Sequence, residues 1–317
     1  MPSPDTVEPT LTTWRTVAMA STITVQAPDG VPGMPTAVEA AFAVFAQVER
    51  DCTRFGTTSA LVRANQHPRR WHRVPPTLGA ALQEASSAYQ ATGGLFDPRV
   101  HDSLVELGYD RTFSEMEDGP TQTQPCRAEP PAPWRPRFLA AARLVHFGGT
   151  RVDLGGIGKG IAIRDASRLL RRTTGDFLID AGGDVYAAGS PAPKAGWLVG
   201  VESPFGAEDP VAVLEVRDVA VATSSIRIRQ WRAGGTQVHH LIDPRTGTPG
   251  GADMCSVTVV HPDPAIAEVW SKALFLSGAD GIAEAAASQG LAALWTDGGG
   301  RLGMSPPMKR FLVWVAR

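Results

Sequence analysis

Cysteine is scarce in this chain of 317 residues, and long apolar runs are missing. The three cysteines, Cys52, Cys126 and Cys255, lie far apart and form no Cys-x-x-Cys pair. This spacing argues against a zinc site, an iron–sulfur cluster and a disulfide framework, and it favours a reducing compartment. No stretch approaches the roughly 18 apolar residues of a membrane span, and the N-terminus has no basic head before an apolar run. We therefore expect a cytoplasmic protein without a membrane span.

The sequence also lacks an excess of either charge. Thirty Lys and Arg residues stand against 32 Asp and Glu residues, which gives a formal net charge of −2. Partners such as bulk nucleic acid or an anionic membrane usually require a strong positive excess. We expect no nucleic-acid partner, and a bound anion must be held by a local arrangement of groups. The 43% of hydrophobic residues are typical of a compact enzyme and exclude a fibrous, collagenous or wholly disordered chain.

The first part of the chain combines a polar tail with strand and helix patterns. Residues 1–13 are predicted to be a flexible tail, and residues 14–317 are predicted to form a single domain. Trp14 to Gln26 alternates apolar and β-branched residues, which predicts one strand. Apolar residues at helical spacing predict helices from Thr36 to Arg54 and from Leu78 to Thr92.

A proline-rich stretch at about 111–137 separates the two halves and predicts a loop, because prolines break helices and central strands. The second half contains two predicted helices, Ile161 to Arg172 and Pro264 to Leu276. Short apolar runs separated by Gly, Pro and Asp predict strands. These runs cover residues 143–147, 177–180, 197–202, 211–215, 255–261 and 292–296. The order of elements predicts an α+β fold rather than regular βαβ winding.

The densest chemical signal is the glycine-rich turn Asp153-Leu154-Gly155-Gly156-Ile157-Gly158-Lys159-Gly160, which leads into a predicted helix. Glycines let backbone N–H groups approach an anion, and a helix N-terminus adds partial positive charge. This construction suits a phosphate, with Lys159 as its counter-ion. The P-loop spacing is missing, and a plain strand-to-helix turn is the alternative interpretation.

Three further polar clusters follow along the chain, each with a structural alternative. Asp180-Ala181-Gly182-Gly183-Asp184 follows a predicted strand, and Thr223-Ser224-Ser225 offers three hydroxyl groups after another. The segment 239–247, which begins with His239-His240, also contains an aspartate, an arginine and a threonine. The alternatives are a Gly-Gly turn, backbone capping by hydroxyl groups and an Asp-Pro turn. Neighbouring residues on a strand point to opposite faces, so at most one histidine should face a given site.

Together, in this order, the four clusters resemble the FAD:protein FMN transferase family, also called the ApbE family, from about Met19 to Leu276. Phe96-Asp97-Pro98 and Ser256-Val257-Thr258-Val259 add to the resemblance. The resemblance implies a T-fold-like α+β architecture with mixed sheets and flanking helices that binds FAD. Such enzymes transfer the FMN half of FAD through a phosphoester to a Ser or Thr of a target flavoprotein and release AMP.

The resemblance also implies positions around the FAD. Met19 would border the FAD, and Lys159 would lie near the diphosphate together with the neighbouring glycines. Asp184 would lie by the adenosine side, and Thr223 and Ser224 by the flavin or a phosphate.

For catalysis, the resemblance implies that His240 is the base that takes the proton of the acceptor hydroxyl. The backbone carbonyl of Gly158 would contribute to a magnesium site. The remaining family ligands are an Asp and, four residues later, a Thr, but this chain has Glu268 and Lys272 there. At an effective dielectric constant of about 20, an ammonium about 4 Å from a divalent ion would be repelled by roughly 8 kcal/mol.

Three arrangements of Lys272 are therefore open. Its side chain could turn away and leave Mg²⁺ to Glu268 and the backbone, or pair with Glu268 as an ordinary helix-surface salt bridge. We favour the third arrangement, in which the ammonium replaces Mg²⁺ against the FAD diphosphate. The leading function is FMN transfer to another protein. The alternatives are a FAD-binding protein without transfer activity and a FAD pyrophosphate hydrolase that gives FMN and AMP.

Overall fold

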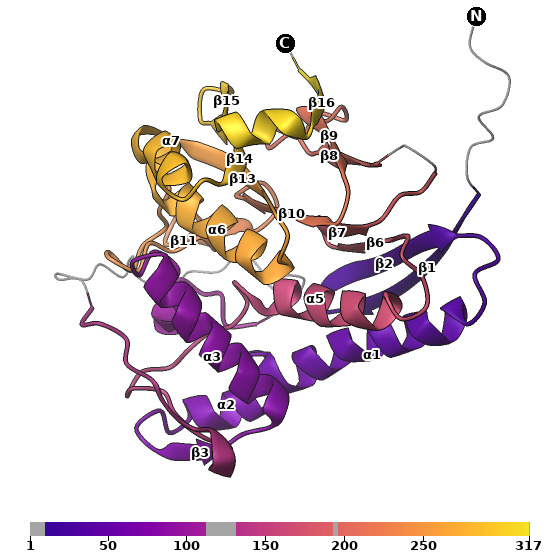
Figure 1. The fold of residues 1–317 in the computed structure, drawn as a ribbon. Helices are drawn as coiled ribbons and strands as arrows, with labels where there is room; N and C mark the ends of the chain where they lie inside the picture. Colours follow the sequence, from indigo (N-terminus) through magenta and orange to yellow (C-terminus); the bar gives the residue numbers. More distant parts are fainter. Residues whose placement is uncertain (1–9, 112–130, 193–195, 317) are drawn as a thin grey trace, which may run out of the picture.

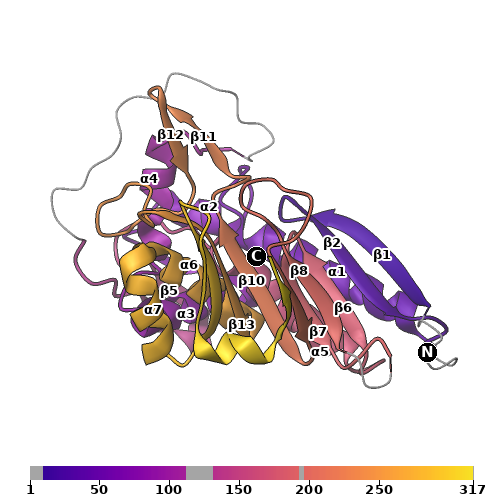
Figure 2. The ribbon, with the colours of Figure 1, turned by 90° about the horizontal axis from the view of Figure 1, so that it is seen from above.

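The computed structural model describes residues 10–111, 131–192 and 196–316. Its main element is an eight-stranded sheet of order β1-β2-β6-β7-β10-β13-β14-β15 (Figures 1 and 2). Every neighbouring pair in this sheet is antiparallel. Its strands are β1 (Leu11–Ala18), β2 (Ser21–Pro28), β6 (Phe177–Ala181), β7 (Asp184–Ala188), β10 (Val219–Ser225), β13 (Met254–His261), β14 (Ala292–Asp297) and β15 (Leu302–Met304).

Three helices cover one face of the sheet: α1 (Met34–Cys52), α5 (Gly158–Leu170) and α6 (Pro264–Leu276) (Figure 1). Helix α5 packs against both α1 and α6, and α6 packs against β10 and β13. Buried residues recur three or four positions apart in α1, which is the spacing of one helix face. They include Val38, Ala41, Phe45 and Val48. Among the described residues, the largest apolar cluster includes the buried side chains between these helices and the sheet.

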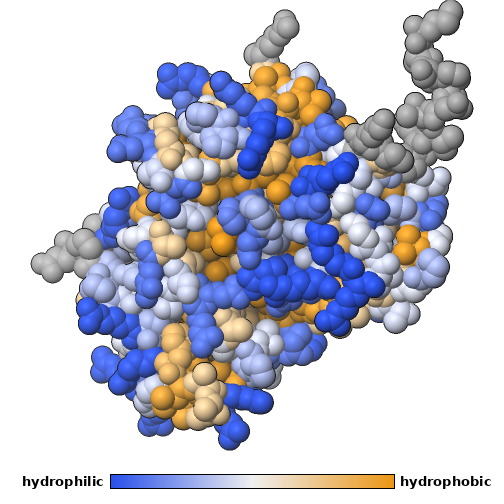
Figure 3. Space-filling model, viewed as in Figure 1, coloured by the Kyte–Doolittle hydropathy of each residue, from blue (hydrophilic) through white to orange (hydrophobic). Residues whose placement is uncertain are grey.

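A second, three-stranded sheet of order β16-β9-β8 lies over the other face of the main sheet (Figure 1). It consists of β8 (Trp197–Val201), β9 (Ala212–Val216) and β16 (Leu312–Val315), and the 3-10 helix η4 (Pro306–Arg310) precedes β16. A separate apolar cluster that includes Leu214, Val221 and Leu294 fills the space between the two sheets. Leu198, which is 66% exposed, lies outside this cluster. Figure 3 shows hydrophobic surface in the upper part of this view, where Figure 1 has β16.

Smaller helices and strands lie around these layers. Besides short 3-10 turns, they are α2 (Ala60–Asn65), α3 (Pro76–Ala91), α4 (His101–Glu106), α7 (Gly278–Ser288), the sheet β3 (Trp71–Arg73), β5 (Leu144–His146) and β4 (Arg137–Leu139), and the hairpin β11 (Gln230–Ala233) and β12 (Thr236–His239). Within the described ranges, no helix combines the length and the apolar character that crossing a membrane requires.

The expected single strand from Trp14 to Gln26 is wrong, because the chain forms the β1–β2 hairpin there. The turn residues Met19 and Ala20 both adopt positive φ values of 54°. A hairpin turn with two such residues usually contains glycine or asparagine, so the sequence carried no turn signal at this point. The strand also begins earlier than expected. Leu11 pairs with Pro28, so residues 11–13 belong to the hairpin rather than to a flexible tail.

The α+β fold class is confirmed, and the predicted helices and strands of the second half lie within a few residues of the observed ones. The expectation of mixed sheets is wrong, because the described sheets contain antiparallel pairs between all their named neighbours. Of the predicted proline-rich loop, residues 112–130 lie outside the described residues. Residues 131–136 form neither helix nor strand, and β4 begins at Arg137.

Replacing Gly160 by alanine should destabilise the protein, because α5 and α6 meet backbone to backbone at this residue. A Cβ atom on Gly160 would lie 2.5 Å from the Cα of Ala265 and 2.6 Å from the carbonyl oxygen of Pro264. Overpacking costs about 3 kcal/mol at the upper end of its usual range, and alanine's better helix propensity returns about 1 kcal/mol. We expect urea unfolding to show a net loss of about 2 kcal/mol.

The matched control for this variant is Gly175→Ala. Nothing lies within 4 Å of a Cβ atom on Gly175, so this variant should unfold like the wild type. Equal stabilities of the two variants would mean that α5 and α6 do not approach as closely as described.

Candidate active site

The glycine-rich turn that precedes α5 is anchored from two sides. The Asp153 carboxylate forms a salt bridge with Arg54, with 2.6 Å between Oδ2 and Nε, and the Arg54 side chain is only 4% exposed. The same carboxylate accepts the N–H of Gly155. The backbone N–H of Asp153 donates to the carbonyl of Pro98 at 2.7 Å, which brings the Phe96-Asp97-Pro98 segment to the turn. Sequence reasoning missed Arg54, because it lies far from Asp153 in the chain.

The backbone N–H groups of this turn are largely used within the protein. Ile157 and Gly158 donate to the Leu154 carbonyl at 3.2 and 2.9 Å, as the chain tightens into the first turn of α5. Gly160 donates to Glu268 Oε2 at 2.7 Å. The expectation of N–H groups free for a phosphate is therefore wrong for these three residues. These three N–H groups are therefore not available to an anion at this turn.

The β1–β2 turn brings Met19 to the start of α5. A Cβ atom on Gly158 would lie 3.3 Å from the Met19 Cε atom, so the two predicted site residues are in contact. The backbone N–H of Met19 donates to Glu49 Oε1 of α1 at 2.9 Å. Glu49 is a second residue that sequence reasoning missed, since nothing in the local pattern of α1 distinguishes it.

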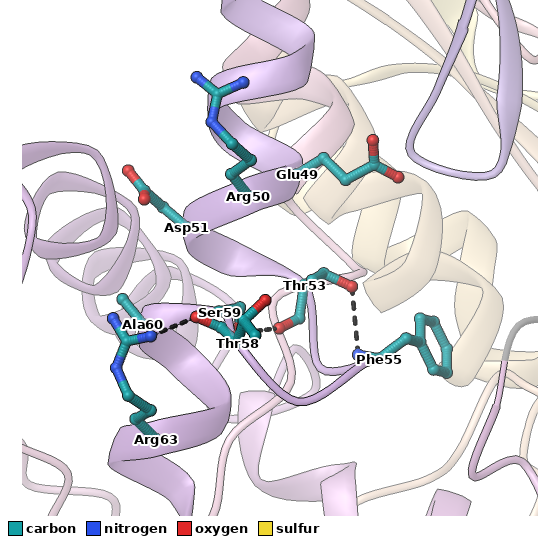
Figure 4. Close-up of a pocket in the computed structure, with 9 residues that line it drawn as sticks. All are labelled: Glu49, Arg50, Asp51, Thr53, Phe55, Thr58, Ser59, Ala60 and Arg63. Atoms are coloured by element: carbon teal, nitrogen blue, oxygen red, sulfur yellow. Dashed lines mark hydrogen bonds between the residues drawn. The ribbon is translucent and has the colours of Figure 1, made fainter.

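A pocket of about 320 Å³ lies where α1 ends and α2 begins, and Figure 4 shows the residues around it. The lining comprises Glu49, Arg50, Asp51, Thr53, Phe55, Thr58, Ser59, Ala60 and Arg63. Several of its polar groups bond to one another: Ser59 Oγ donates to the Thr53 carbonyl at 2.6 Å, and the N–H of Phe55 donates to Thr53 Oγ1 at 3.1 Å. These contacts hold the turn between the helices. Glu49 connects this pocket to Met19.

Lys159 and Asp184 form an ion pair inside the protein, between α5 and the start of β7. Their side chains are 15% and 6% exposed. Lys159 Nζ also lies 3.5 Å from the Ala181 carbonyl, and Asp184 Oδ1 accepts the N–H of Thr223 at 3.2 Å. The two predicted site residues therefore neutralise each other, and their pairing ties α5 to the centre of the sheet.

Thr223 and Ser224 follow one another on β10, and their side chains make contacts on opposite faces of the sheet. Thr223 Oγ1 lies 2.9 Å from Thr258 Oγ1 on the neighbouring strand β13. Ser224 Oγ lies 2.8 Å from the hydroxyl oxygen of Ser271 on α6. Ser271, which sequence reasoning missed, donates in turn to the Glu268 carbonyl at 2.9 Å. Ser224 is thus the one that faces α6.

Glu268 and Lys272, one turn apart on α6, form a salt bridge of 3.2 Å between Oε1 and Nζ. Of the three arrangements considered for Lys272, the structure has the pairing with Glu268. The pair is not an ordinary surface bridge, because the Glu268 side chain is 1% exposed and that of Lys272 is 19% exposed. Lys272 Nζ also lies 3.4 Å from the backbone carbonyl of Glu268.

The donor set at this position does not fit a magnesium ion. One Glu268 oxygen faces the Lys272 ammonium, and the other accepts the Gly160 N–H. Magnesium requires near-octahedral oxygen ligands at about 2.0–2.1 Å, and an ammonium is a repulsive neighbour. The part of the chain that the structure describes contains no group of three or more His, Cys, Asp or Glu side chains placed to hold a metal.

His240 lies one residue beyond the end of β12. Its Nδ1 lies 3.3 Å from the Arg229 carbonyl. Because a carbonyl only accepts, this contact places the imidazole proton on Nδ1 and leaves Nε2 with a free lone pair. Burial, together with the positive charges of Arg229 and Lys272, holds the pKa of His240 well below its usual value of 6.5. His240 is therefore a neutral imidazole at pH 7, which can accept a proton.

His239, the last residue of β12, has different surroundings. Its ring packs edge-on against Phe275 of α6, with ring centroids 6.0 Å apart. Burial lowers the pKa of His239 to about 4. The rest of the motif forms a turn, because Arg245 pairs with Asp243 at 2.7 Å and the Gly247 N–H donates to the Asp243 carbonyl. For Asp243 and Arg245 the structural interpretation as an Asp-Pro turn accounts for the contacts.

The lowered pKa values of the two histidines predict a loss of stability on acidification. Below about pH 6.5 the unfolded chain binds protons at His239 and His240 that the folded protein does not bind. The free energy of unfolding therefore decreases as the pH is lowered. For His239 this loss continues down to about pH 4. In urea unfolding between pH 6.5 and 5, His239→Gln should flatten this dependence by up to about 1.4 kcal/mol per pH unit. An unchanged slope would contradict this origin.

Comparison with known proteins extends these observations. The ApbE family model matches residues 19–295. A FAD:protein FMN transferase of Treponema pallidum is 29% identical over 225 residues, which cover 65% of this chain and 61% of that protein. That of Salmonella typhimurium is 31% identical over 167 residues, which cover 51% and 48%. The chain thus spans about half to three fifths of the length of these curated relatives.

Solved structures agree on the fold. The ApbE protein of Thermotoga maritima has a TM-score of 0.82 at 24% identity, covering 95% of this chain and 99% of that one. The flavin transferase ApbE of Vibrio cholerae has a TM-score of 0.75 at 20% identity, covering 96% and 100%. The ApbE-like α+β architecture expected from the motifs is confirmed. Since the family model matches most of the sequence, this chain belongs to the ApbE family.

Proposed function

We propose that this protein is a FAD:protein FMN transferase. The observation that carries the proposal is the meeting of residues from separate motifs around one glycine-rich turn. Met19 contacts Gly158, and Glu268 accepts the N–H of Gly160. Lys272 lies over Gly156 and acts by its charge on His240. A proton acceptor, His240, and a cation, Lys272, are thus close enough to interact electrostatically. Phosphoryl-type transfer requires both kinds of group at one site.

In the proposed reaction His240 Nε2 takes the proton from the hydroxyl group of an acceptor Ser or Thr. The hydroxyl oxygen attacks the phosphorus of the FMN half of FAD and forms the phosphoester bond. The bond between this phosphorus and the bridging oxygen breaks, and AMP leaves with the electron pair. The Nδ1–H···O contact with Arg229 orients the imidazole so that Nε2 is the basic nitrogen.

The other predicted residues have supporting roles in this proposal. Met19 and the Gly158 backbone border the FAD, and Ser224 lies on the α6 side of β10. The Lys159–Asp184 pair holds α5 against the sheet and thereby positions the glycine-rich turn. Thr223 contributes through its backbone contact with Asp184.

FAD is the substrate, and the second partner is a target flavoprotein that carries the acceptor Ser or Thr. Its identity does not follow from the sequence. The absence of nucleic-acid partners and the cytoplasmic location, which we derived from charge and cysteine content, stay predictions.

Incubation of the purified protein with FAD tests the proposal, with and without a candidate flavoprotein acceptor, followed by chromatography for AMP and free FMN. We expect AMP together with flavin fluorescence on the acceptor band of a denaturing gel. AMP with an equal amount of free FMN would instead indicate a FAD pyrophosphate hydrolase. FAD binding without AMP release under any condition would indicate a FAD-binding protein without transfer activity.

A further inference from the structure

Glu268 and Lys272, which lie on α6 next to the glycine-rich turn, form an ion pair with each other. Glu268 uses Oε2 for the Gly160 N–H at 2.7 Å and Oε1 for Lys272 Nζ at 3.2 Å. This carboxylate is 1% exposed and has no oxygen turned toward solvent. Its charge is therefore compensated inside the protein, without a metal ion.

Lys272 retains bonding capacity beyond this pair. An ammonium has three N–H donors, and Lys272 directs two of them at the Oε1 and backbone carbonyl oxygens of Glu268. No third acceptor lies within bonding distance among the residues that the structure describes. The side chain is 19% exposed, so its nitrogen is reachable from outside, whereas its carboxylate partner is not.

The lysine stem places this ammonium at the glycine-rich turn. A Cβ atom on Gly156 would lie 3.3 Å from Lys272 Cδ and 3.4 Å from its Cε, so a side chain there would push the lysine away. The positive charge of Lys272 also contributes to the lowered pKa of His240. The ammonium therefore lies at the turn and acts by its charge on the proposed base.

We propose that the Lys272 ammonium, held by Glu268, is a built-in cation that binds the diphosphate of FAD in place of a divalent metal ion. This inference rests on the proposed function, which supplies FAD as the ligand. Most N–H groups of the turn are used internally, so the diphosphate needs a cationic side chain. Lys159 pairs with Asp184, and Arg54, whose buried Nη2 is unpartnered among the described residues, pairs with Asp153. Lys272 is the cation whose stem lies against Gly156 of the turn.

FAD affinity, measured by quenching of FAD fluorescence, tests the proposal without any need for turnover. In the unmodified protein the dissociation constant should be the same in EDTA and in MgCl₂. Lys272→Met should raise it about tenfold or more, because a charge-assisted hydrogen bond to the diphosphate is lost. ADP affinity should fall in parallel, whereas riboflavin, which has no phosphate, should be unaffected.

Two further variants separate ligand binding from folding. Lys272→Met alone leaves the buried Glu268 carboxylate without its partner, so Glu268→Gln with Lys272→Met removes both charges and should show the same loss of FAD affinity. Glu268→Asp with Lys272→Thr recreates two oxygen ligands one turn apart and should make FAD binding depend on Mg²⁺. Arg301→Met breaks an i,i+4 pair between the exposed Arg301 side chain and Asp297 outside the site and is the matched control, with unchanged affinity.

The proposal is overturned if EDTA abolishes FAD binding to the unmodified protein, or if both lysine variants bind FAD and ADP normally. FAD binding that is independent of metal and is lost when Lys272 is replaced would support this inference. If the unmodified protein binds FAD in this way but releases no AMP, FMN transfer would be contradicted. Failure to bind FAD at all would overturn both.

Discussion

Replacing His240 by alanine is expected to slow AMP release from FAD about 100- to 10,000-fold and to change FAD affinity little. A general base contributes a factor of this size to the rate and little to ground-state binding. His240 is suited to the role because its Nδ1 faces the Arg229 carbonyl and its pKa is held well below the usual value. The acid limb of its pH–rate profile should accordingly lie below pH 6.5.

Two variants control this result. His240→Asn can still donate a hydrogen bond to the Arg229 carbonyl but has no basic nitrogen, so it should be as slow as His240→Ala. His239→Gln changes the imidazole that packs against Phe275 and should stay within a fewfold of the wild-type rate. A larger loss of rate with His239→Gln than with His240→Ala would show that His239, and not His240, is the base.

Replacing Asp184 by alanine is expected to lower the free energy of unfolding by about 3–5 kcal/mol. The variant leaves the Lys159 ammonium without its partner at a position where that side chain is 15% exposed. Removing one member of a buried ion pair costs this much, because the remaining charge is no longer compensated. Asp184 also accepts the Thr223 N–H, so the variant leaves a second donor unpaired. Urea unfolding at pH 7 measures the effect.

The double variant Lys159→Met with Asp184→Ala should recover part of this loss, because neither charge of the pair remains. A solvent-exposed pair provides the reference: Glu202→Ala removes the partner of Arg227, and the change should not exceed about 1 kcal/mol. If Asp184→Ala left stability intact and reduced FAD affinity instead, Asp184 would act on the ligand rather than as an internal partner of Lys159.

The secondary structure and the family motifs were accessible from the sequence for a local reason. Helix α1 was predicted because Val38, Ala41, Phe45 and Val48 recur at the spacing of one helix face, and this periodicity is a property of neighbouring residues. The motif residues that suggested the ApbE family are likewise contiguous in the chain. The β1–β2 hairpin escaped prediction because its turn at Met19 has neither glycine nor asparagine.

The partners of the site residues came only from the tertiary structure. Arg54 meets Asp153, and Gly160 meets Glu268, across long stretches of chain whose separation carries no signal. The pairing of Lys272 was one of several arrangements open to its flexible side chain. Burial of Glu268 at the close approach of α5 and α6 selects the pairing, since an uncompensated carboxylate there would be costly. Local periodicity decides which segments form helices and strands, whereas the packing of those segments decides which charges compensate one another.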